Sequence, residues 1–213
     1  CVYKHFDYVF ANCIDSKNNF VSKFPHMKEK VGVYYNYLDV KEIKEMKMNA
    51  FLAVGQGSIN EPHFIHLTYK PKTQPRKKIA LVGKGITFDA GGMNIKPATS
   101  MLTMKSDMTG AASVLGIMQA IAKIKPDIEL HVISALCENM TSGSAYKQGD
   151  VLTAMNGKTI EVDNTDAEGR ITLADALSYA DELNVDEVID IATMTGAVIV
   201  SLGHNITGVL GNN

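Results

Sequence analysis

The apolar run IALV at residues 79–82 constrains the fold more than any other stretch of the sequence. A strand that faces water on one side alternates apolar and polar residues, whereas this run is apolar at every position and needs cover on both faces. Helices on both faces of a sheet provide that cover in α/β proteins. The run therefore predicts a strand over residues 77–85 inside a layered α/β fold.

Strand and helix patterns alternate along the rest of the chain. The patterns predict strands over 63–70, 128–136 and the start of 187–203, the last of which is expected to be buried, and helices over 108–124 and 171–183. The helix over 108–124 is indicated by apolar residues at helical spacing, and it starts just after Asp107. Short glycine-bearing links join these elements. We therefore predict a three-layer α/β/α fold with a mixed, largely parallel central sheet.

Residues 1–50 are the least informative part of the sequence, although KVGVYYNYL at 30–38 has the β-branched and aromatic content of a strand. The chain has 213 residues, of which 46% are hydrophobic and 21% charged. This length and composition suffice for one substantial core, so we expect one domain.

Charge, cysteine content and hydropathy exclude several classes of protein. A formal net charge of -2 provides no basic field for nucleic acid, and the Lys-rich stretch 71–78 is interpreted as a solvated turn. Three cysteines without a CxxC pair indicate a reducing compartment and argue against a cysteine-based zinc site. No apolar stretch approaches the roughly 20 residues that span a bilayer, and no signal-peptide pattern is present. We expect a cytoplasmic protein that does not enter a membrane.

Two charged clusters follow predicted strands, in residues 83–107 and 163–170. They contain the candidate functional residues Lys84, Asp89, Lys96, Asp107, Asp166, Glu168 and Arg170. Taken singly, most of these have a structural explanation. An aspartate just before a helix is a favoured N-cap, acidic residues stabilise a helix N-terminus, and the lysines fit a solvated surface.

Taken together, the acidic residues favour a metal site. In parallel sheets functional loops gather beyond the carboxyl ends of the strands, which would bring Asp89, Asp107, Asp166 and Glu168 to one place. Four like charges at one place require compensation, and two divalent cations would balance them. This count predicts a dinuclear centre, with metal ions about 3.5–4 Å apart. Carboxylate ligands suit Mg²⁺, Mn²⁺ or Zn²⁺.

Other motifs do not fit the sequence. VGKGITFD matches neither GxGxxG nor GxxxxGK[ST], DNTDAEG lacks the residue order of an EF-hand loop, and no GxSxG is present. His131, within IELHVISAL, is interpreted as a core or edge histidine.

The segments NTDAEGRITLADAL, VGKGITFDAGGMNIKP and ENMTSGSAYKQGDVLTAMNGKTIEV closely resemble the cytosolic leucyl aminopeptidase family of dizinc metallopeptidases. The resemblance runs in order from about residue 50 to the end of the sequence. It implies that residues 51–213 are a metallopeptidase catalytic domain, truncated at its C-terminal end, and that residues 1–50 are a linker and the start of the catalytic fold. Ala90 departs from the serine that is common in the family's FDSGG segment.

The resemblance also implies roles for individual residues. Lys84, Asp89, Asp107 and Glu168 would hold one metal ion, Zn²⁺ or Mn²⁺, and Asp89, Asp166 and Glu168 would hold the other. Lys96 would polarise the scissile carbonyl, and Arg170 would hold a bicarbonate ion that accepts a proton. The residues implied for substrate binding are Met104, Thr193, Met194, Thr195 and Gly196.

The activity implied is removal of N-terminal residues, preferably apolar ones such as leucine, from peptide substrates by a homo-hexamer. Two alternatives within the family stay open from the sequence. One is an inactive, truncated scaffold. The other is a DNA-binding regulatory member, which the mildly acidic charge argues against.

Overall fold

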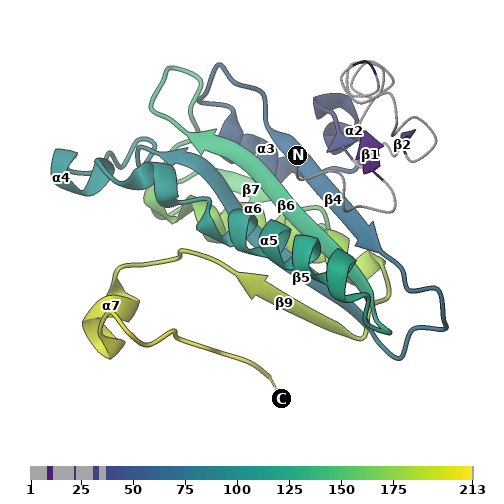
Figure 1. Ribbon diagram of the computed structural model, residues 1–213. Coiled ribbons are helices and arrows are strands. Elements are labelled where there is room, and N and C mark those ends of the chain that lie inside the picture. The colour runs from purple at the N-terminus through teal and green to yellow at the C-terminus, as the bar shows by residue number, and fades with distance from the viewer. Residues whose placement is uncertain (1–8, 12–21, 23–30, 34–36, 213) are drawn as a thin grey trace.

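A five-stranded mixed sheet forms the centre of the protein (Figure 1). The computed structural model describes residues 9–11, 22, 31–33 and 37–212. The strands lie in the order β3 (Tyr37–Leu38), β4 (His63–Tyr69), β6 (Glu129–Asn139), β5 (Lys78–Asp89) and β9 (Glu187–Ile191). β5 is parallel to β6 and to β9, whereas β4 is antiparallel to both β6 and β3. The parallel part of the sheet is therefore the part that contains the IALV run.

Helices cover both faces of the sheet, as the IALV run predicts. Leu81 of β5 packs in one apolar cluster with Val114 of α5 (Thr109–Ile124). Its neighbours Ala80 and Val82 pack in another cluster, with α3 (Asn49–Gly55) and α6 (Glu168–Glu182). Figure 1 shows α5 crossing the near face of the sheet and α6 lying behind it. The predicted three-layer α/β/α architecture is confirmed.

The predicted elements over 63–70, 108–124 and 128–136 correspond closely to β4, α5 and β6. Two others are longer than predicted. β5 continues to Asp89, with an irregular register between Ile86 and Phe88. α6 begins at Glu168 rather than at 171, so Glu168, Gly169 and Arg170 belong to its first turn.

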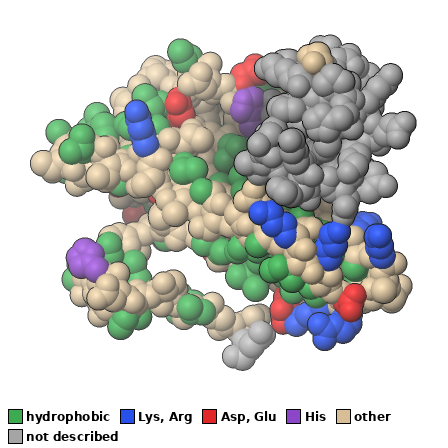
Figure 2. Space-filling model, viewed as in Figure 1, with side chains coloured by type: hydrophobic (Ala, Val, Ile, Leu, Met, Phe, Trp, Pro, Cys, Tyr) green, Lys and Arg blue, Asp and Glu red, His purple; other side chains and the backbone are tan. Residues whose placement is uncertain are grey.

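The segment 187–203 differs from the prediction. It was expected to open as a buried strand, but β9 is the edge strand of the sheet, and Val188 and Ile189 are 41% and 48% exposed. No described strand pairs with its outer edge. After β9 the chain forms α7 (Ala197–Leu202), and exposed apolar residues continue through Val209 and Leu210. Figure 2 shows green, hydrophobic side chains over this arm, which Figure 1 draws in yellow.

The smaller elements lie at the periphery. They are β1 (Val9–Ala11), β2 (Val31–Val33), α2 (Val40–Glu45), β7 (Val151–Thr153), β8 (Thr159–Glu161), α4 (Ala98–Met101), η3 (Met104–Ser106) and η4 (Thr165–Ala167). The strand predicted over 30–38 corresponds to β2 and β3, and residues 34–36 between them lie outside the described residues. Most of the segment predicted as a linker, residues 1–50, also lies outside them.

A buried carboxylate joins three of these elements. Asp175 of α6 is 0% exposed, and its Oδ2 accepts a hydrogen bond of 2.8 Å from the backbone N–H of Phe51 in α3. Its Oδ1 accepts one of 2.7 Å from the backbone N–H of Met155, between β7 and β8. α3 has no side-chain cap from its own N-cap residue, Met48. Asp175 therefore satisfies a free donor of the α3 N-terminus from a distant part of the chain.

Among the described residues, none of the helices combines the length and the hydropathy that a membrane span requires.

Candidate metal centre

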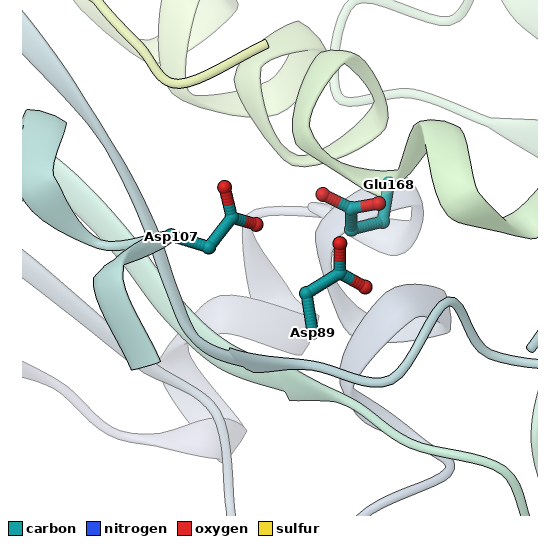
Figure 3. A group of neighbouring side chains, drawn as sticks. All are labelled: Asp89, Asp107 and Glu168. Carbon is teal, nitrogen blue, oxygen red and sulfur yellow. The ribbon is translucent and has the colours of Figure 1, made fainter. Parts of the chain in front are cut away.

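Three buried carboxylates meet where the two covering helices begin. Asp89 is the last residue of β5, Asp107 directly follows η3 and precedes α5, and Glu168 is the first residue of α6. One carboxylate oxygen of each lies within 4.8 Å of one oxygen of the other two. Figure 3 shows the three side chains directed toward one another. All three are at most 5% exposed.

Two glycines allow the helices to approach the sheet this closely. A Cβ atom on Gly110 of α5 would lie 2.0 Å from the backbone oxygen of Ile191. A Cβ atom on Gly169 of α6 would lie 2.5 Å from Cε of Lys84. Real Cβ atoms do not come so near to other heavy atoms, so a side chain on Gly110 would clash with the backbone of β9, and a side chain on Gly169 would displace the end of the Lys84 side chain.

Lys84 lies between two of the carboxylates. Its Nζ is 2.9 Å from Oδ2 of Asp107, 2.8 Å from Oε1 of Glu168 and 2.8 Å from the backbone oxygen of Thr193, to which it donates. Burial of the ammonium lowers its pKa, but the charges and hydrogen bonds of Glu168 and Asp107 outweigh burial. The net effect is a raised pKa for Lys84, so these contacts favour its protonated form.

Lys96 connects Asp89 to the fourth acidic residue of the predicted cluster. Its Nζ lies 3.0 Å from Oδ2 of Asp89 and 2.6 Å from Oδ1 of Asp166. Burial lowers the pKa of Lys96, but the hydrogen bonds and charges of Asp166 and Asp89 raise it by more. Asp166 is not within the group of three converging carboxylates, and it joins them through this ammonium.

The carboxylates of the group are electrostatically strained. Burial raises the pKa of Glu168 to about 7, against the opposing charge of Lys84 and together with the like charges of Asp89 and Asp107. Burial also raises the pKa of Asp107, although Lys84 and the Thr193 hydroxyl oppose the shift. Raised carboxyl pKa values of this origin mean that the contacts with Lys84 do not fully offset the cost of burying the charged carboxylates.

The donor set fits a divalent cation. Oε2 of Glu168 is buried and has no hydrogen-bond partner among the described residues. Buried polar atoms normally have a partner, and a bound cation would provide one for this oxygen. The converging atoms are carboxylate oxygens, which are hard ligands for Mg²⁺, Mn²⁺ or Zn²⁺. An amine ligand from Lys84 would require loss of its proton.

Of the remaining predicted residues, Thr193 contacts this group. Thr193 donates from Oγ1 to Oδ1 of Asp107 over 2.7 Å, in addition to its backbone contact with Lys84. Met104 is the first residue of η3 and is partly buried. Arg170 is exposed in the first turn of α6. Like Thr193, the residues Met194, Thr195 and Gly196 after β9 are exposed.

A polar network that the sequence analysis missed surrounds Asp89. Asn139 donates from Nδ2 to Oδ1 of Asp89 over 2.8 Å and to the backbone oxygen of Thr165 over 3.0 Å. Tyr146 donates to the same Thr165 oxygen over 2.7 Å. Asn94 accepts from the backbone N–H of Thr165 over 2.8 Å. Isolated Asn, Thr and Tyr residues form no motif in the sequence, so their role can be recognised only from the structure.

His131 lies in the core, as predicted, and forms a second polar network. It is 7% exposed, and its Nδ1 lies 2.8 Å from Nε2 of His66. His66 also contacts the hydroxyl of Tyr179, at 2.9 Å from Nδ1, and His131 contacts Oε1 of Glu129 at 3.1 Å. Neither ring lies in the carboxylate group.

Comparison with known proteins places the chain beside one family. A family model described as "Cytosol aminopeptidase family, catalytic domain" matches residues 11–213. The proteins named "Probable cytosol aminopeptidase" from Aquifex aeolicus and Nostoc punctiforme are 56% and 57% identical to the chain over 186 and 178 residues. These alignments cover 87% and 83% of the chain but 38% and 36% of the two relatives. A relative of the same name from a Sulfurihydrogenibium species is 54% identical over 195 residues. The chain thus spans a little over a third of the length of the curated relatives it matches.

Proposed function

Since the chain belongs to the cytosol aminopeptidase family, we propose that the protein is a metal-dependent aminopeptidase that releases N-terminal residues, preferably apolar ones such as leucine, from peptides. The observation that carries the proposal is the convergence of Asp89, Asp107 and Glu168 within 4.8 Å beside the ammonium of Lys84. Buried carboxylates gathered at the end of a sheet are costly for folding alone, and a metal centre accounts for them.

The ligands of the first proposed metal ion, Zn²⁺ or Mn²⁺, are Lys84, Asp89, Asp107 and Glu168. Those of the second are Asp89, Asp166 and Glu168. Asp89 and Glu168 would belong to both sites, and both are buried members of the converging group. When bound, such a pair of ions lowers the pKa of a coordinated water molecule to about 7 and polarises the scissile carbonyl.

The two lysines would have opposite roles. Lys84 would act as a neutral ligand, which requires that its amine release the proton favoured by its present carboxylate contacts. Lys96 would stay protonated and donate a hydrogen bond to the oxyanion that forms when water attacks the peptide carbonyl. The contacts of Lys96 with Asp89 and Asp166 support this role, because they raise its pKa and hold its Nζ beside the group.

Arg170 would bind a bicarbonate ion that accepts the proton of the attacking water. Its exposed position in the first turn of α6, two residues after Glu168, supports this assignment. No histidine belongs to the described carboxylate group, so a proton acceptor from outside the side chains is chemically reasonable.

The side-chain pocket for the substrate would include Met104, and the exposed segment Thr193–Gly196 would contact the substrate backbone. Thr193 supports this part of the proposal, because its hydroxyl and its carbonyl oxygen both contact members of the charged group. A free N-terminal amine can coordinate a metal ion, whereas an internal peptide nitrogen cannot do so comparably, which would restrict cleavage to chain ends. We also propose a homo-hexamer in the cytoplasm, on the resemblance to the family and the name of the curated relatives.

The test is hydrolysis of a leucyl chromogenic amide by the purified protein with Mn²⁺ or Zn²⁺. Asp166→Ala should lower the metal content, whereas Lys96→Ala should keep the metal and lower kcat by about 100-fold or more. Lys158→Ala, which changes an exposed lysine in the β7–β8 turn, is the control and should keep full activity. Absence of turnover with either metal, in a folded and metal-loaded sample, would refute the proposed activity.

A further inference from the structure

Asn139 occupies an unusual position at the edge of the charged group. It is the last residue of β6, pairs in register with Asp89 at the end of β5, and is 0% exposed. The backbone N–H of Ala90 donates to its carbonyl oxygen over 2.9 Å, so the two strands stay paired to their last residues. The backbone pairing therefore holds the Cα atom of Asn139 beside Asp89.

The orientation of the Asn139 amide is determined by its neighbours. The two atoms that Nδ2 contacts, Oδ1 of Asp89 and the backbone oxygen of Thr165, are both acceptors. A reversed amide would place an oxygen against two oxygens, so the orientation with Nδ2 toward them is the favourable one. Oδ1 of Asn139 is buried without a hydrogen-bond partner among the described residues. Nδ2 of the amide therefore donates two hydrogen bonds, while Oδ1 accepts none from the described residues.

These contacts divide the two oxygens of the Asp89 carboxylate. Oδ1 accepts from Asn139 and, over 2.9 Å, from the backbone N–H of Gly91. Oδ2 lies toward Lys96, at 3.0 Å from Nζ. The two donors on Oδ1 restrict rotation of the carboxylate. They also leave Oδ2 as the oxygen that faces cationic groups and can bind a cation.

We propose that Asn139 is a positioning residue of the metal centre, which holds the Asp89 carboxylate in its ligating orientation. The proposal rests on the metal-dependent function proposed above. Hydrogen bonds to a ligating carboxylate restrict its rotation, so a ligand that is already oriented loses less freedom when it binds a cation. Asn139 acts through Asp89 and does not touch the substrate or the metal.

The experiment is a Mn²⁺ titration of the purified protein, with free Mn²⁺ measured by electron paramagnetic resonance. Asn139→Leu removes the amide but leaves both acceptors with a partner, because Gly91 still donates to Asp89 and Tyr146 still donates to Thr165. The urea unfolding midpoint should therefore change little, while the Mn²⁺ dissociation constant should rise by about 10- to 100-fold.

Two control variants separate positioning from general packing. Asn60→Leu removes an exposed amide that donates to Oε2 of Glu138 over 3.0 Å, a hydrogen bond of the same chemical kind outside the charged group. Tyr146→Phe removes the other donor to the Thr165 oxygen but no contact with Asp89. Both variants should bind Mn²⁺ within about twofold of the unmodified protein. Where Asn139→Leu does not fold, Asn139→Val, which is smaller and suits a strand, replaces it in the same titration.

The outcomes are distinct. Unmodified protein that binds no Mn²⁺ would refute the proposed metal centre and this proposal with it. Unmodified protein that binds Mn²⁺, with an Asn139 variant of equal affinity, would refute the positioning role alone. A Tyr146→Phe loss as large as that of Asn139→Leu would assign the effect to the Thr165 loop and would likewise overturn the role assigned here.

Discussion

Replacement of Asp175 by alanine should destabilise the protein by about 2–4 kcal/mol. The buried carboxylate accepts hydrogen bonds from the backbone N–H groups of Phe51 and Met155, which lie 124 and 20 residues away in the sequence. Its removal leaves two donors without a partner, and each buried donor left unpaired costs about 1–3 kcal/mol. The sum of these costs is an upper estimate.

The predicted destabilisation is smaller than the sum of the two hydrogen-bond costs because burial of the Asp175 charge is itself unfavourable. Burial raises the pKa of Asp175, and the backbone hydrogen bonds from Phe51, Met155 and Ala50 oppose the shift without cancelling it. The charged carboxylate is therefore held at some cost in the native state, and alanine relieves that cost. The relief offsets part of the loss, so the expected change lies below the full sum of the two hydrogen bonds.

Equilibrium unfolding in urea measures the effect, through the midpoint at an unchanged slope. Asp175→Asn should lie between the unmodified protein and Asp175→Ala, because its amide oxygen can still accept one hydrogen bond while its NH₂ group faces a donor. Asp181→Ala, at an exposed position of the same helix, should stay within about 0.5 kcal/mol of the unmodified protein. A change of less than about 0.5 kcal/mol for Asp175→Ala would contradict the structural role given to this carboxylate.

Three further predictions concern helix approach and pH. Gly169→Ala places a Cβ against the flexible end of Lys84, so stability should change by less than about 1 kcal/mol while Mn²⁺ affinity, measured by titration, falls about tenfold or more. Gly110→Ala places a Cβ 2.0 Å from the backbone oxygen of Ile191, which cannot yield, so urea unfolding should show a loss of about 3 kcal/mol. Burial and the nearby His131 lower the pKa of His66 to about 4. Between about pH 6.5, the pKa in the unfolded chain, and about pH 4, the pKa in the folded chain, only the unfolded chain binds a proton at His66. The free energy of unfolding should therefore fall by roughly 2 kcal/mol from pH 7 to pH 4, after allowance for partial solvent screening. His66→Gln should remove this part of the pH dependence, as measured by urea unfolding at each pH.

The layered fold could be predicted because its signals are local. An apolar strand such as IALV requires cover on both faces, and alternation of strands and helices implies the layers that provide it. The exposed edge at β9 could not be predicted in the same way. EVIDI has the apolar content of a buried strand, and only its place in the strand order decides how much of it is covered.

The start of α6 shows a second limit. The apolar, Ala-rich run ITLADALSYADEL predicts a helix that begins at 171, after Gly169 and Arg170. In the structure the helix begins at Glu168, and the side chain of Lys84 lies where a Cβ on Gly169 would be. A side chain at this position would thus displace the end of Lys84, which lies 85 residues away in the sequence, and no local pattern records this contact.

The residues of the candidate site could be selected from the sequence by charge and position, but their connections could not. The sequence suggested that Asp89, Asp107, Asp166 and Glu168 meet at one place, and it treated the lysines as separate groups. In the structure three of the carboxylates converge, and Asp166 joins them through Lys96. The supporting amide of Asn139 had no signal at all, because a lone asparagine at the end of a strand resembles many others.

The balance of charge in this group links the fold to the proposed chemistry. Four carboxylates and the two ammonium groups of Lys84 and Lys96 leave an excess of negative charge when all are ionised. Burial raises the pKa of Glu168 to about 7 against the opposing charge of Lys84, and the like charges of Asp89 and Asp107 add to the rise. Because Asp89, Asp107 and Glu168 are buried, water screens the repulsion between their charges poorly. The fold holds this acidic group together at the carboxyl ends of its parallel strands, and binding of divalent cations there would reduce the repulsion between the carboxylates.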